Sequence, residues 1–274
     1  MNTAYVLQQR IRTAFAAAAE HADPKTVPSS DVCLDLDLAR RIATIRRVVR
    51  GRVVFTTNFG IEDQAIAHAI FTQALAIDVV TLDTGRLFAE TYELWAQMER
   101  RYRRRIHAYY PDRAGVESLV ACQGINGFYT SVEARHTCCT VRKVEPLGRA
   151  LAGATAWVTG LRADQSDERA GIAFAAADPI HRLVKVNPLF DWSREQVLAF
   201  IREHGIPSNP LHDQGFPSIG CAPCTRAVAA GEPERAGRWW WEHEQKKECG
   251  LHSHSRPQAP APAQFEGFPK EVTP

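Results

Sequence analysis

Apolar strand-like segments and amphipathic helical segments alternate along this chain from residue 51 onward. The stretch "RVVFTTNFG" (52–60) has the composition of a buried strand that runs into a glycine turn, and "IEDQAIAHAIFTQAL" (61–75) has helical spacing of its apolar residues. Further strands are predicted at 78–85, 106–110, 156–162 and 184–192, and further helices at 88–105 and 193–205. This alternation is typical of a parallel sheet with helices on both faces, so we expect an α/β fold with a parallel twisted sheet.

The regular alternation ends with the helix over 193–205, which begins at the capping-box pair Ser193 and Gln196 and closes at Gly205. The last residues are rich in Pro and Ala and lack periodicity, so we expect them to be mobile. The sequence therefore predicts three parts: an N-terminal helical segment (1–45), an α/β domain (46–245) and a mobile C-terminal segment (246–274).

The N-terminal stretch "MNTAYVLQQRIRTAFAAAAEHA" is not typical of a secretory signal, because Arg10 and Arg12 interrupt its apolar residues. We expect a short amphipathic helix here, with an organelle transit peptide as the lesser alternative. No apolar run approaches the roughly 20 residues of a membrane helix. These features predict a cytoplasmic protein with no membrane contact. In that reducing compartment, the seven cysteines are expected to be metal ligands or reactive thiols.

The charge balance argues against a protein that binds nucleic acid over a broad surface. The 33 Lys and Arg residues nearly match the 31 Asp and Glu residues, which leaves a net charge of +2. A local basic site for a small anion remains compatible with this balance.

Open α/β sheets bind ligands beyond the carboxyl ends of their strands, where the strand order reverses. We therefore expect the functional site in three loops that follow predicted strands: 56–63, 83–87 and 160–169. The first, "TTNFGIED", joins a glycine turn to the polar side chains of Thr56, Thr57 and Asn58, and its backbone N–H groups could cradle an anion. "LDTGR" (82–86) adds a second polar loop at the same edge.

Four cysteines form two close pairs, Cys138 with Cys139 and Cys221 with Cys224. Four thiols are enough for a structural zinc site or for an iron–sulfur cluster. Adjacent side chains point apart on a helix or strand, so "CC" reaches one small ion awkwardly, whereas a cubane offers separate irons at its corners. This geometry favours the cluster and leaves zinc as the alternative.

Five cations accompany these thiols and strand ends: Arg142, Lys143, Arg162, Arg235 and Arg238. Arg162 ends the predicted strand 156–162, and the spacing of Arg235 and Arg238 would place both on one face of a helix. Because arginine presents paired donors that match phosphate or sulfate oxygens, these residues predict an anion site. Each one taken alone also fits a solvated surface residue.

A fifth cysteine, Cys249, lies between lysines and a histidine in "KKECGLH". Lys246, Lys247 and His252 would lower the pKa of this thiol and favour its thiolate form. On a mobile segment, such a thiolate could move over an active site and withdraw. Cys33 and Cys122 have no such surroundings and are interpreted as idle surface cysteines.

Six motifs occur in the order of one known family: "LDTGRLFAETYEL", "CCTVRKVEPLGRAL", "WVTGLRADQSDERA", "SIGCAPCTR", "GRWWWE" and "KECGLH". With these motifs, the region from roughly residue 50 to 252 resembles the assimilatory sulfonucleotide reductases, in particular the adenylyl-sulfate (APS) reductase branch with an iron–sulfur cluster. The resemblance implies an adenine nucleotide α-hydrolase-like fold. It also implies reduction of APS to sulfite and AMP with thioredoxin, or a glutaredoxin-like reductant, as the partner in sulfate assimilation and cysteine biosynthesis.

Matched motif by motif, the resemblance assigns roles to individual residues. Cys249 would be the nucleophile that forms an S-sulfocysteine intermediate, and Cys138, Cys139, Cys221 and Cys224 would bind a [4Fe–4S] cluster. The substrate-binding residues would be Thr57, Asn58, Gly60, Asp83, Thr84, Gly85, Lys143, Arg162, Arg235 and Arg238. The cluster would tune the electrostatics of the anion site, and thiol exchange already accounts for the electrons. A homo-oligomer is compatible with these features.

The chain departs from the family pattern at the nucleotide loop, where relatives read like "SFSGAED" and this chain has "TNFGIED". The individual contacts of Thr57 and Asn58 are therefore open, as is the choice between Arg135 and His136 for a contact with substrate. The loop also lacks "SGGxDS", which argues against an ATP pyrophosphatase. Two alternatives remain: a reductase of 3'-phosphoadenylyl sulfate (PAPS) or of both substrates, and a zinc-stapled nucleic-acid-binding module.

Overall fold

The structure is a computed structural model that describes residue 6, residues 9–13 and residues 37–242. In this part of the chain, one six-stranded sheet has the order β3-β2-β1-β4-β6-β5. Its strands are β1 (Arg52–Thr57), β2 (Asp78–Leu82), β3 (His107–Tyr109), β4 (Ala154–Val158), β5 (Ala175–Asp178) and β6 (Leu183–Val186). All neighbouring strands pair in parallel except β5, which runs antiparallel to β6. The order reverses between β1 and β4, because β2 and β3 extend the sheet on one side and β6 and β5 on the other.

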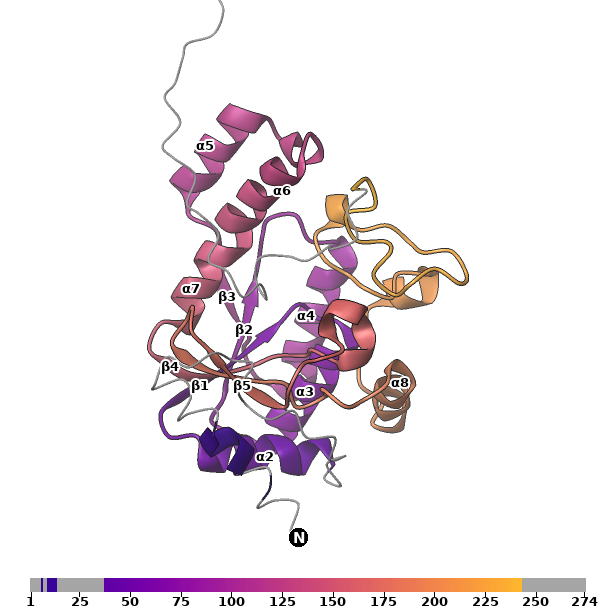
Figure 1. The fold of residues 1–274 in the computed structure, drawn as a ribbon. Helices are drawn as coiled ribbons and strands as arrows, with labels where there is room; N and C mark the ends of the chain where they lie inside the picture. Colours follow the sequence, from indigo (N-terminus) through magenta and orange to yellow (C-terminus); the bar gives the residue numbers. More distant parts are fainter. Residues whose placement is uncertain (1–5, 7–8, 14–36, 243–274) are drawn as a thin grey trace, which may run out of the picture.

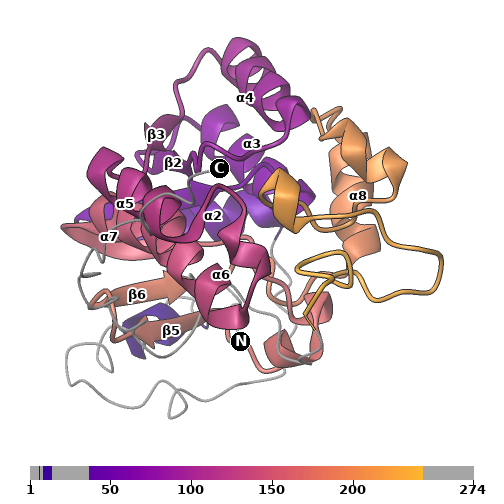
Figure 2. The ribbon, with the colours of Figure 1, turned by 90° about the horizontal axis from the view of Figure 1, so that it is seen from above.

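Helices cover both faces of the sheet (Figures 1 and 2). One side carries α2 (Leu38–Val48), α3 (Ile61–Thr72), α4 (Ala89–Tyr102) and α8 (Arg194–Glu203). The other side carries α7 (Glu145–Leu151), and α5 (Arg113–Gln123) and α6 (Val132–Cys139) lie beyond it. Since successive strand residues point to opposite faces, Phe55 packs in the larger core with α2 and α3, while Val54 packs with Leu147 of α7.

The predicted alternation of strands and helices is confirmed, as is the capping box of Ser193 and Gln196 at the start of α8. Gly205 closes that helix with a φ of 53°, a left-handed conformation that glycine adopts without strain. The sequence reading missed β5 and the helices α5, α6 and α7. β5 is a short, mostly alanine segment with little of the β-branched character that marks a strand.

The predicted boundary at residue 45 falls inside α2, whose residues Ile42 and Ile45 are buried in the larger core. Ile11 is buried in the same core. The proposed C-terminal part, 246–274, lies outside the described residues. Within the described residues, no helix combines the length and apolar character that crossing a membrane requires.

Candidate active site at the switch point of the sheet

A pocket opens at the carboxyl ends of β1 and β4, where the strand order reverses. Its walls include Thr56 and Thr57 at the end of β1, Thr159 and Gly160 after β4, and Thr84 after β2. The three loops that the sequence indicated all contribute to the lining. This is the place where open α/β sheets bind their ligands, so the topology and the cavity point to the same site.

The turn after β1 is held by its own hydrogen bonds. The N–H of Asn58 donates to Asp63 Oδ2 at 2.6 Å, that of Phe59 to Thr57 Oγ1 at 3.0 Å, and that of Gly60 to Asn58 Oδ1 at 2.9 Å. These three N–H groups are therefore engaged within the turn. The expectation that this turn cradles an anion with its backbone is not supported for them, although Thr57, Asn58 and Gly60 do line the pocket.

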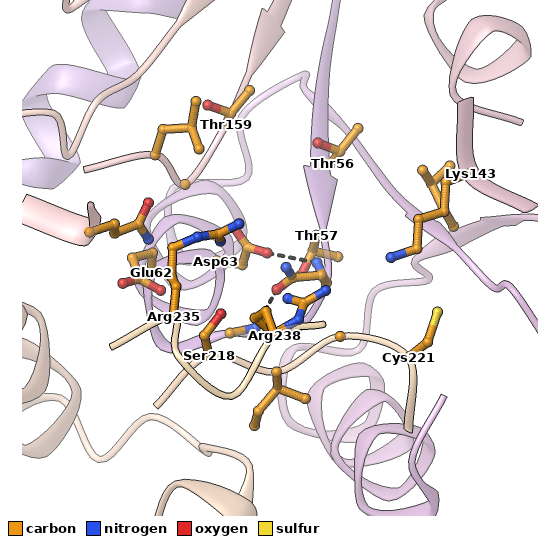
Figure 3. Close-up of a pocket in the computed structure, with 18 of the residues that line it drawn as sticks. Thr56, Thr57, Glu62, Asp63, Lys143, Thr159, Ser218, Cys221, Arg235 and Arg238 are labelled. Carbon is orange, nitrogen blue, oxygen red and sulfur yellow. Dashed lines mark hydrogen bonds between the residues drawn. The ribbon is translucent and has the colours of Figure 1, made fainter. Parts of the chain in front are cut away.

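The first turn of α3 gives the pocket an acidic end, shown on the left of Figure 3. Glu62 pairs with Arg162, and Asp63 lies beside Gly160. Burial, with a smaller contribution from the charge of Glu62, raises the pKa of Asp63 to about 8, against the opposing hydrogen bonds from Asn58 and Thr57. Asp63 is therefore a neutral acid near pH 7, able both to donate and to accept a hydrogen bond.

Substitution of Asp63 by Asn is expected to flatten the pH dependence of stability. Since the folded state keeps a proton that the unfolded chain loses near pH 3.8, the free energy of unfolding should fall as the pH rises from about 4 to about 8. The slope is at most ~1.4 kcal/mol per pH unit. Thermal denaturation across this range measures it for both proteins. The control is Glu117→Gln at an exposed position, and a wild-type slope in Asp63→Asn would contradict the prediction.

Lys143, Arg235 and Arg238 give the pocket its basic character. In Figure 3 the amine of Lys143 points into the cavity from the side of Cys221, and Arg238 lies between this amine and the acidic end. Nε of Arg238 is buried and has no hydrogen-bond partner among the described residues. A buried, unsatisfied guanidinium N–H is costly, so an anion in the pocket that accepts from this N–H would stabilise it.

The predicted helix around Arg235 and Arg238 is wrong. Residues 234–237 form a turn, and Arg238 forms a bridge with Thr225. Gly237 and Gly220 explain this packing. A Cβ at Gly237 would overlap the carbonyl of Arg226, and one at Gly220 would overlap the Arg238 guanidinium. The two arginines share the pocket through this turn.

Arg162 does not line the pocket, in contrast to the other three cations assigned to the substrate. Its guanidinium is fully buried and donates to Glu62 at 2.7 Å, Asp164 at 3.0 Å and Glu234 at 2.9 Å. Because Glu62 lies in the first turn of α3 and Glu234 precedes Arg235, Arg162 links the turn that carries Arg235 to the acidic end of the pocket. Its direct contact with substrate stays a prediction that this geometry does not favour.

The loop after β2 connects the pocket to the cysteines. Thr84 lines the pocket, and its hydroxyl lies 3.3 Å from the sulfur of Cys221. Asp83 and Gly85 do not line it. Asp83 accepts hydrogen bonds from the Gly85 N–H and the Tyr92 hydroxyl, both at 2.8 Å, and so shapes the loop. A direct contact of Asp83 or Gly85 with substrate stays a prediction that this lining does not favour.

The structure brings the four paired cysteines into one cluster. Cys139, Cys221 and Cys224 are buried with Trp239, and Cys138 packs against them. None of these four cysteines forms a disulfide among the described residues. Cys122, by contrast, is exposed on α5. The two halves of the cluster come from the end of α6 and from a loop more than 80 residues later, so only the fold joins them.

Two of these thiols, those of Cys138 and Cys224, are poorly suited to remain uncompensated anions. Burial is the largest influence on both pKa values: it raises the pKa of Cys138, and it raises the pKa of Cys224 to about 12. The positive charge of Lys143 acts to lower both pKa values. Trp241, which packs against the cluster, has a buried indole N–H with no partner in the described part of the chain. Among the described residues, no three His, Cys, Asp or Glu side chains are arranged to hold a single metal ion.

A π-helical turn over Thr140–Val144 separates α6 from α7, and it carries Lys143. π-Helical turns occur mostly as local insertions and are frequent at functional sites. Here the turn directly follows Cys139, and Lys143 reaches the pocket while it interacts electrostatically with Cys138 and Cys224. Lys143 thus links the pocket to the thiol cluster, whose members Cys221 and Trp239 also line the pocket.

Two residues shortly before the cysteine pair, Arg135 and His136, are the candidates for a contact with substrate. Arg135 is buried and pairs with Glu242, away from the pocket lining, and His136 is not in the lining either. Cys249 lies outside the described residues.

The sequence reading also overlooked several pocket residues: Asp63, Thr159, Gly160, Arg169 and Ser218. The predicted loops include Asp63, Gly160 and Arg169, and the quoted motifs "WVTGLRADQSDERA" and "SIGCAPCTR" include Thr159 and Ser218 without assigning them a role.

Comparison with known proteins identifies the relatives of this chain. The family model for the phosphoadenosine phosphosulfate reductase domain matches residues 52–227. An adenosine 5'-phosphosulfate reductase of Rhizobium meliloti (strain 1021) is 56% identical over 223 residues, which cover 81% of this chain and 84% of the relative. One of Allochromatium vinosum is 52% identical over 223 residues, 81% of this chain and 82% of the relative.

A crystal structure of phosphoadenylyl-sulfate (PAPS) reductase from Candida auris, in complex with phosphate, superposes with a TM-score of 0.60. It is 26% identical, and the match covers 71% of this chain and 91% of that chain. The sheet order and the pocket at its switch point therefore define an α/β protein with the adenine nucleotide α-hydrolase-like fold. Within that class, the chain belongs to the phosphoadenosine phosphosulfate reductase family.

Proposed function

We propose that this protein reduces adenylyl sulfate (APS) to sulfite and AMP, with thioredoxin or a similar dithiol protein as the reductant. The observation that carries the proposal is the convergence of Lys143, Arg235 and Arg238 in one pocket beside the cysteine cluster. Relatives that are 52–56% identical are named adenosine 5'-phosphosulfate reductases. The enzyme would thus be an oxidoreductase that acts on sulfur.

In the proposed reaction, the thiolate of Cys249 attacks the sulfur of APS. A sulfur–sulfur bond forms, the bond from that sulfur to the phosphate oxygen breaks, and AMP leaves with the electron pair. The product on the protein is an S-sulfocysteine. A thiolate of the reductant then attacks the Cys249 sulfur and expels sulfite, and the second thiol of the reductant releases Cys249. The dithiol supplies both electrons and ends as a disulfide.

Different pocket residues would bind different parts of the substrate. Lys143, Arg235 and Arg238 would hold the phosphate and sulfate groups and stabilise the charge that develops on departing AMP. Thr57, Asn58, Gly60 and Thr84 would line the nucleotide, and neutral Asp63 would offer a hydrogen bond without repelling the anion.

We further propose that Cys138, Cys139, Cys221 and Cys224 bind a [4Fe–4S] cluster. Buried thiols with raised pKa values fit ligands whose negative charge a metal compensates. The unpartnered N–H of Trp241 fits an acceptor within this cluster of side chains. When bound, the cluster would supply a fixed charge distribution beside the anion site, because Cys221 lines the pocket and Lys143 interacts electrostatically with Cys138 and Cys224.

A PAPS reductase is the second candidate, because the superposable Candida auris protein has that name. Its 26% identity is well below the 52–56% of the relatives named for APS. The paired cysteines also favour APS, by the resemblance described above.

Intact-protein mass spectrometry after anaerobic incubation with APS and no reductant tests the function. We expect a gain of one SO3 group, no gain in Cys249→Ser, and release of sulfite on addition of thioredoxin. An adduct with PAPS alone would identify PAPS as the substrate in place of APS and leave the proposed thiolate chemistry unchanged. Absence of any adduct on cluster-loaded protein would reject the thiolate mechanism.

A further inference from the structure

His212 lines the pocket, and the function proposed above leaves it without a role. It lies in the short helix η6 (Pro210–Gln214), which follows α8 in the chain, and its side chain is partly buried. Backbone hydrogen bonds hold the turn around it: the N–H of His212 donates to the carbonyl of Asn209 at 3.0 Å, and that of Phe216 to the carbonyl of Leu211 at 3.0 Å. The imidazole therefore stands on a well-defined backbone.

A hydrogen bond of the ring defines its tautomer. Nδ1 of His212 lies 2.8 Å from the carbonyl oxygen of Phe216. A carbonyl oxygen only accepts, so Nδ1 carries the proton and donates it to this bond. In a neutral imidazole the other nitrogen, Nε2, is then an acceptor. Nε2 is buried and has no hydrogen-bond partner among the described residues.

The surroundings of His212 keep the ring neutral. Burial is the largest influence and lowers the pKa of His212 below its ordinary value of 6.5, and the charge of Arg194 acts in the same direction. The bond to the Phe216 carbonyl and the charges of Glu62 and Asp213 oppose this shift. Near pH 7, Nε2 is therefore an acceptor without a donor, and a ligand O–H or N–H that donates to it would remove the cost of leaving it unpaired.

Adenylyl sulfate has few groups that can donate to Nε2. Its phosphate and sulfate oxygens carry no proton near pH 7. The donors are the 6-amino group of adenine and the hydroxyls of the ribose. His212 would thus face either the base or the sugar.

The two sides of the sheet supply different parts of the pocket wall. Apolar side chains that suit a base come from the side of α7, where they pack in one cluster: Leu82, Leu147 and Trp157. His212 instead interacts electrostatically with Glu62 of α3 and Arg194 of α8, two helices on the opposite side. This division favours the ribose as the neighbour of His212.

We propose that Nε2 of His212 accepts a hydrogen bond from a ribose hydroxyl and so makes the site selective for APS over PAPS. The proposal rests on the function assigned above and concerns its substrate. Because the 2'- and 3'-hydroxyls are neighbours on the ribose, a 3'-phosphate would lie close to Nε2 whichever of them donates. That phosphate is mostly without a proton near pH 7, and the carboxylates of Glu62 and Glu234 line the same pocket. A site built to bond a hydroxyl rejects an analogue without it, because the buried acceptor is then left unpaired.

Calorimetry with full-length, cluster-loaded protein tests the contact by binding alone. The variant is His212→Asn, whose amide N–H can replace Nδ1 in the bond to Phe216 and which has no group at the position of Nε2. We expect its Kd for AMP to be roughly 3–10-fold higher. One of the two nucleotides 2'-deoxy-AMP and 3'-deoxy-AMP should bind both proteins equally, because it lacks the donating hydroxyl. Adenosine 3',5'-bisphosphate should also bind both equally, so the preference for AMP over it shrinks by the same factor.

His204→Asn is the matched control. His204 also donates from Nδ1 to a carbonyl, that of Phe200 at 3.1 Å, but it is exposed and does not line the pocket. This variant should bind every nucleotide as the unchanged protein does. His212→Gln places an amide oxygen near the position of Nε2 and should restore part of the AMP affinity.

Three results would overturn the contact. Wild-type AMP affinity in His212→Asn is the first, and an equal loss for AMP and both deoxy nucleotides, as a purely structural role would cause, is the second. The third is that inosine monophosphate, which lacks the 6-amino group, is the nucleotide that binds both proteins equally. If His212→Asn does not fold, equal affinities of the unchanged protein for AMP and both deoxy nucleotides reject the proposal, and weaker binding of one of them supports it. Failure of the unchanged protein to form the SO3 adduct instead overturns the proposed function.

Discussion

Substitution of Cys224 by serine is expected to remove the proposed iron–sulfur cluster and nearly all sulfite production. The change replaces one buried sulfur in a cluster of side chains that packs four thiols around Trp239. Loss of a ligand should lower activity by more than the roughly 10–100-fold that loss of an outer-shell partner causes. Iron and acid-labile sulfide per chain, the visible absorption of the cluster and the rate of sulfite release measure the effect.

The exposed Cys122 provides the control, since Cys122→Ser removes a thiol outside the cluster. This variant should keep wild-type iron and activity. Full iron content in Cys224→Ser would contradict the assignment of this ligand. If the unchanged protein contains zinc and no iron, the four cysteines form a structural zinc site. The proposed iron–sulfur cluster is then rejected, and the anion pocket needs an explanation without it.

The sheet could be predicted from the sequence because its central strands are buried on both faces. Continuous apolar runs such as the one before the "TTNFG" turn have few other interpretations when helices follow them. β5 (Ala175–Asp178) is at the edge of the sheet and consists mostly of alanine, so it lacks that signal. The helix α6 was also missed, since its short "VEARHTCC" sequence has little amphipathic periodicity.

The sequence predicted which loops form the site, but it did not predict which side chains contact one another there. The rule for strand ends located the loops, because it depends on topology alone. It did not distinguish Arg238, which faces the pocket, from Arg162, which three carboxylates hold behind it. The two residues look alike in the sequence. Only the positions of Glu62 and Glu234, which are distant in the chain, show that Arg162 is held by carboxylates while Arg238 lines the pocket.

The pairing of Arg135 with Glu242 illustrates the same limit. Proximity to the cysteine pair made Arg135 a candidate for substrate contact, whereas its partner lies more than 100 residues further along the chain. The π-helical turn over Thr140–Val144 was equally hidden, because one additional residue in a helical turn leaves no mark in the sequence. Tertiary packing decides both features.

Substitution of Gly220 by alanine is expected to weaken APS binding strongly while the protein still folds. A Cβ at this position would overlap the guanidinium of Arg238, which is the far end of a flexible side chain and can swing away. The fold therefore survives, and the anion site loses the residue whose Nε has no other partner among the described residues. A hydrogen bond to a charged group contributes about 1.5–3 kcal/mol, so the dissociation constant for AMP and the KM for APS should rise roughly 10–100-fold.

Gly171 provides the matched control, since a Cβ there would meet nothing within 4 Å. Gly171→Ala should bind AMP as the unchanged protein does. Calorimetry of AMP binding and thermal denaturation of both variants separate a lost ligand contact from a damaged fold. Wild-type affinity in Gly220→Ala would show that Arg238 is not an anion ligand. A loss of AMP affinity in Gly220→Ala with an unchanged melting temperature would show that Gly220 controls substrate binding without contacting the substrate. The reason is that only a residue without a side chain at this position leaves room for the Arg238 guanidinium to face the substrate.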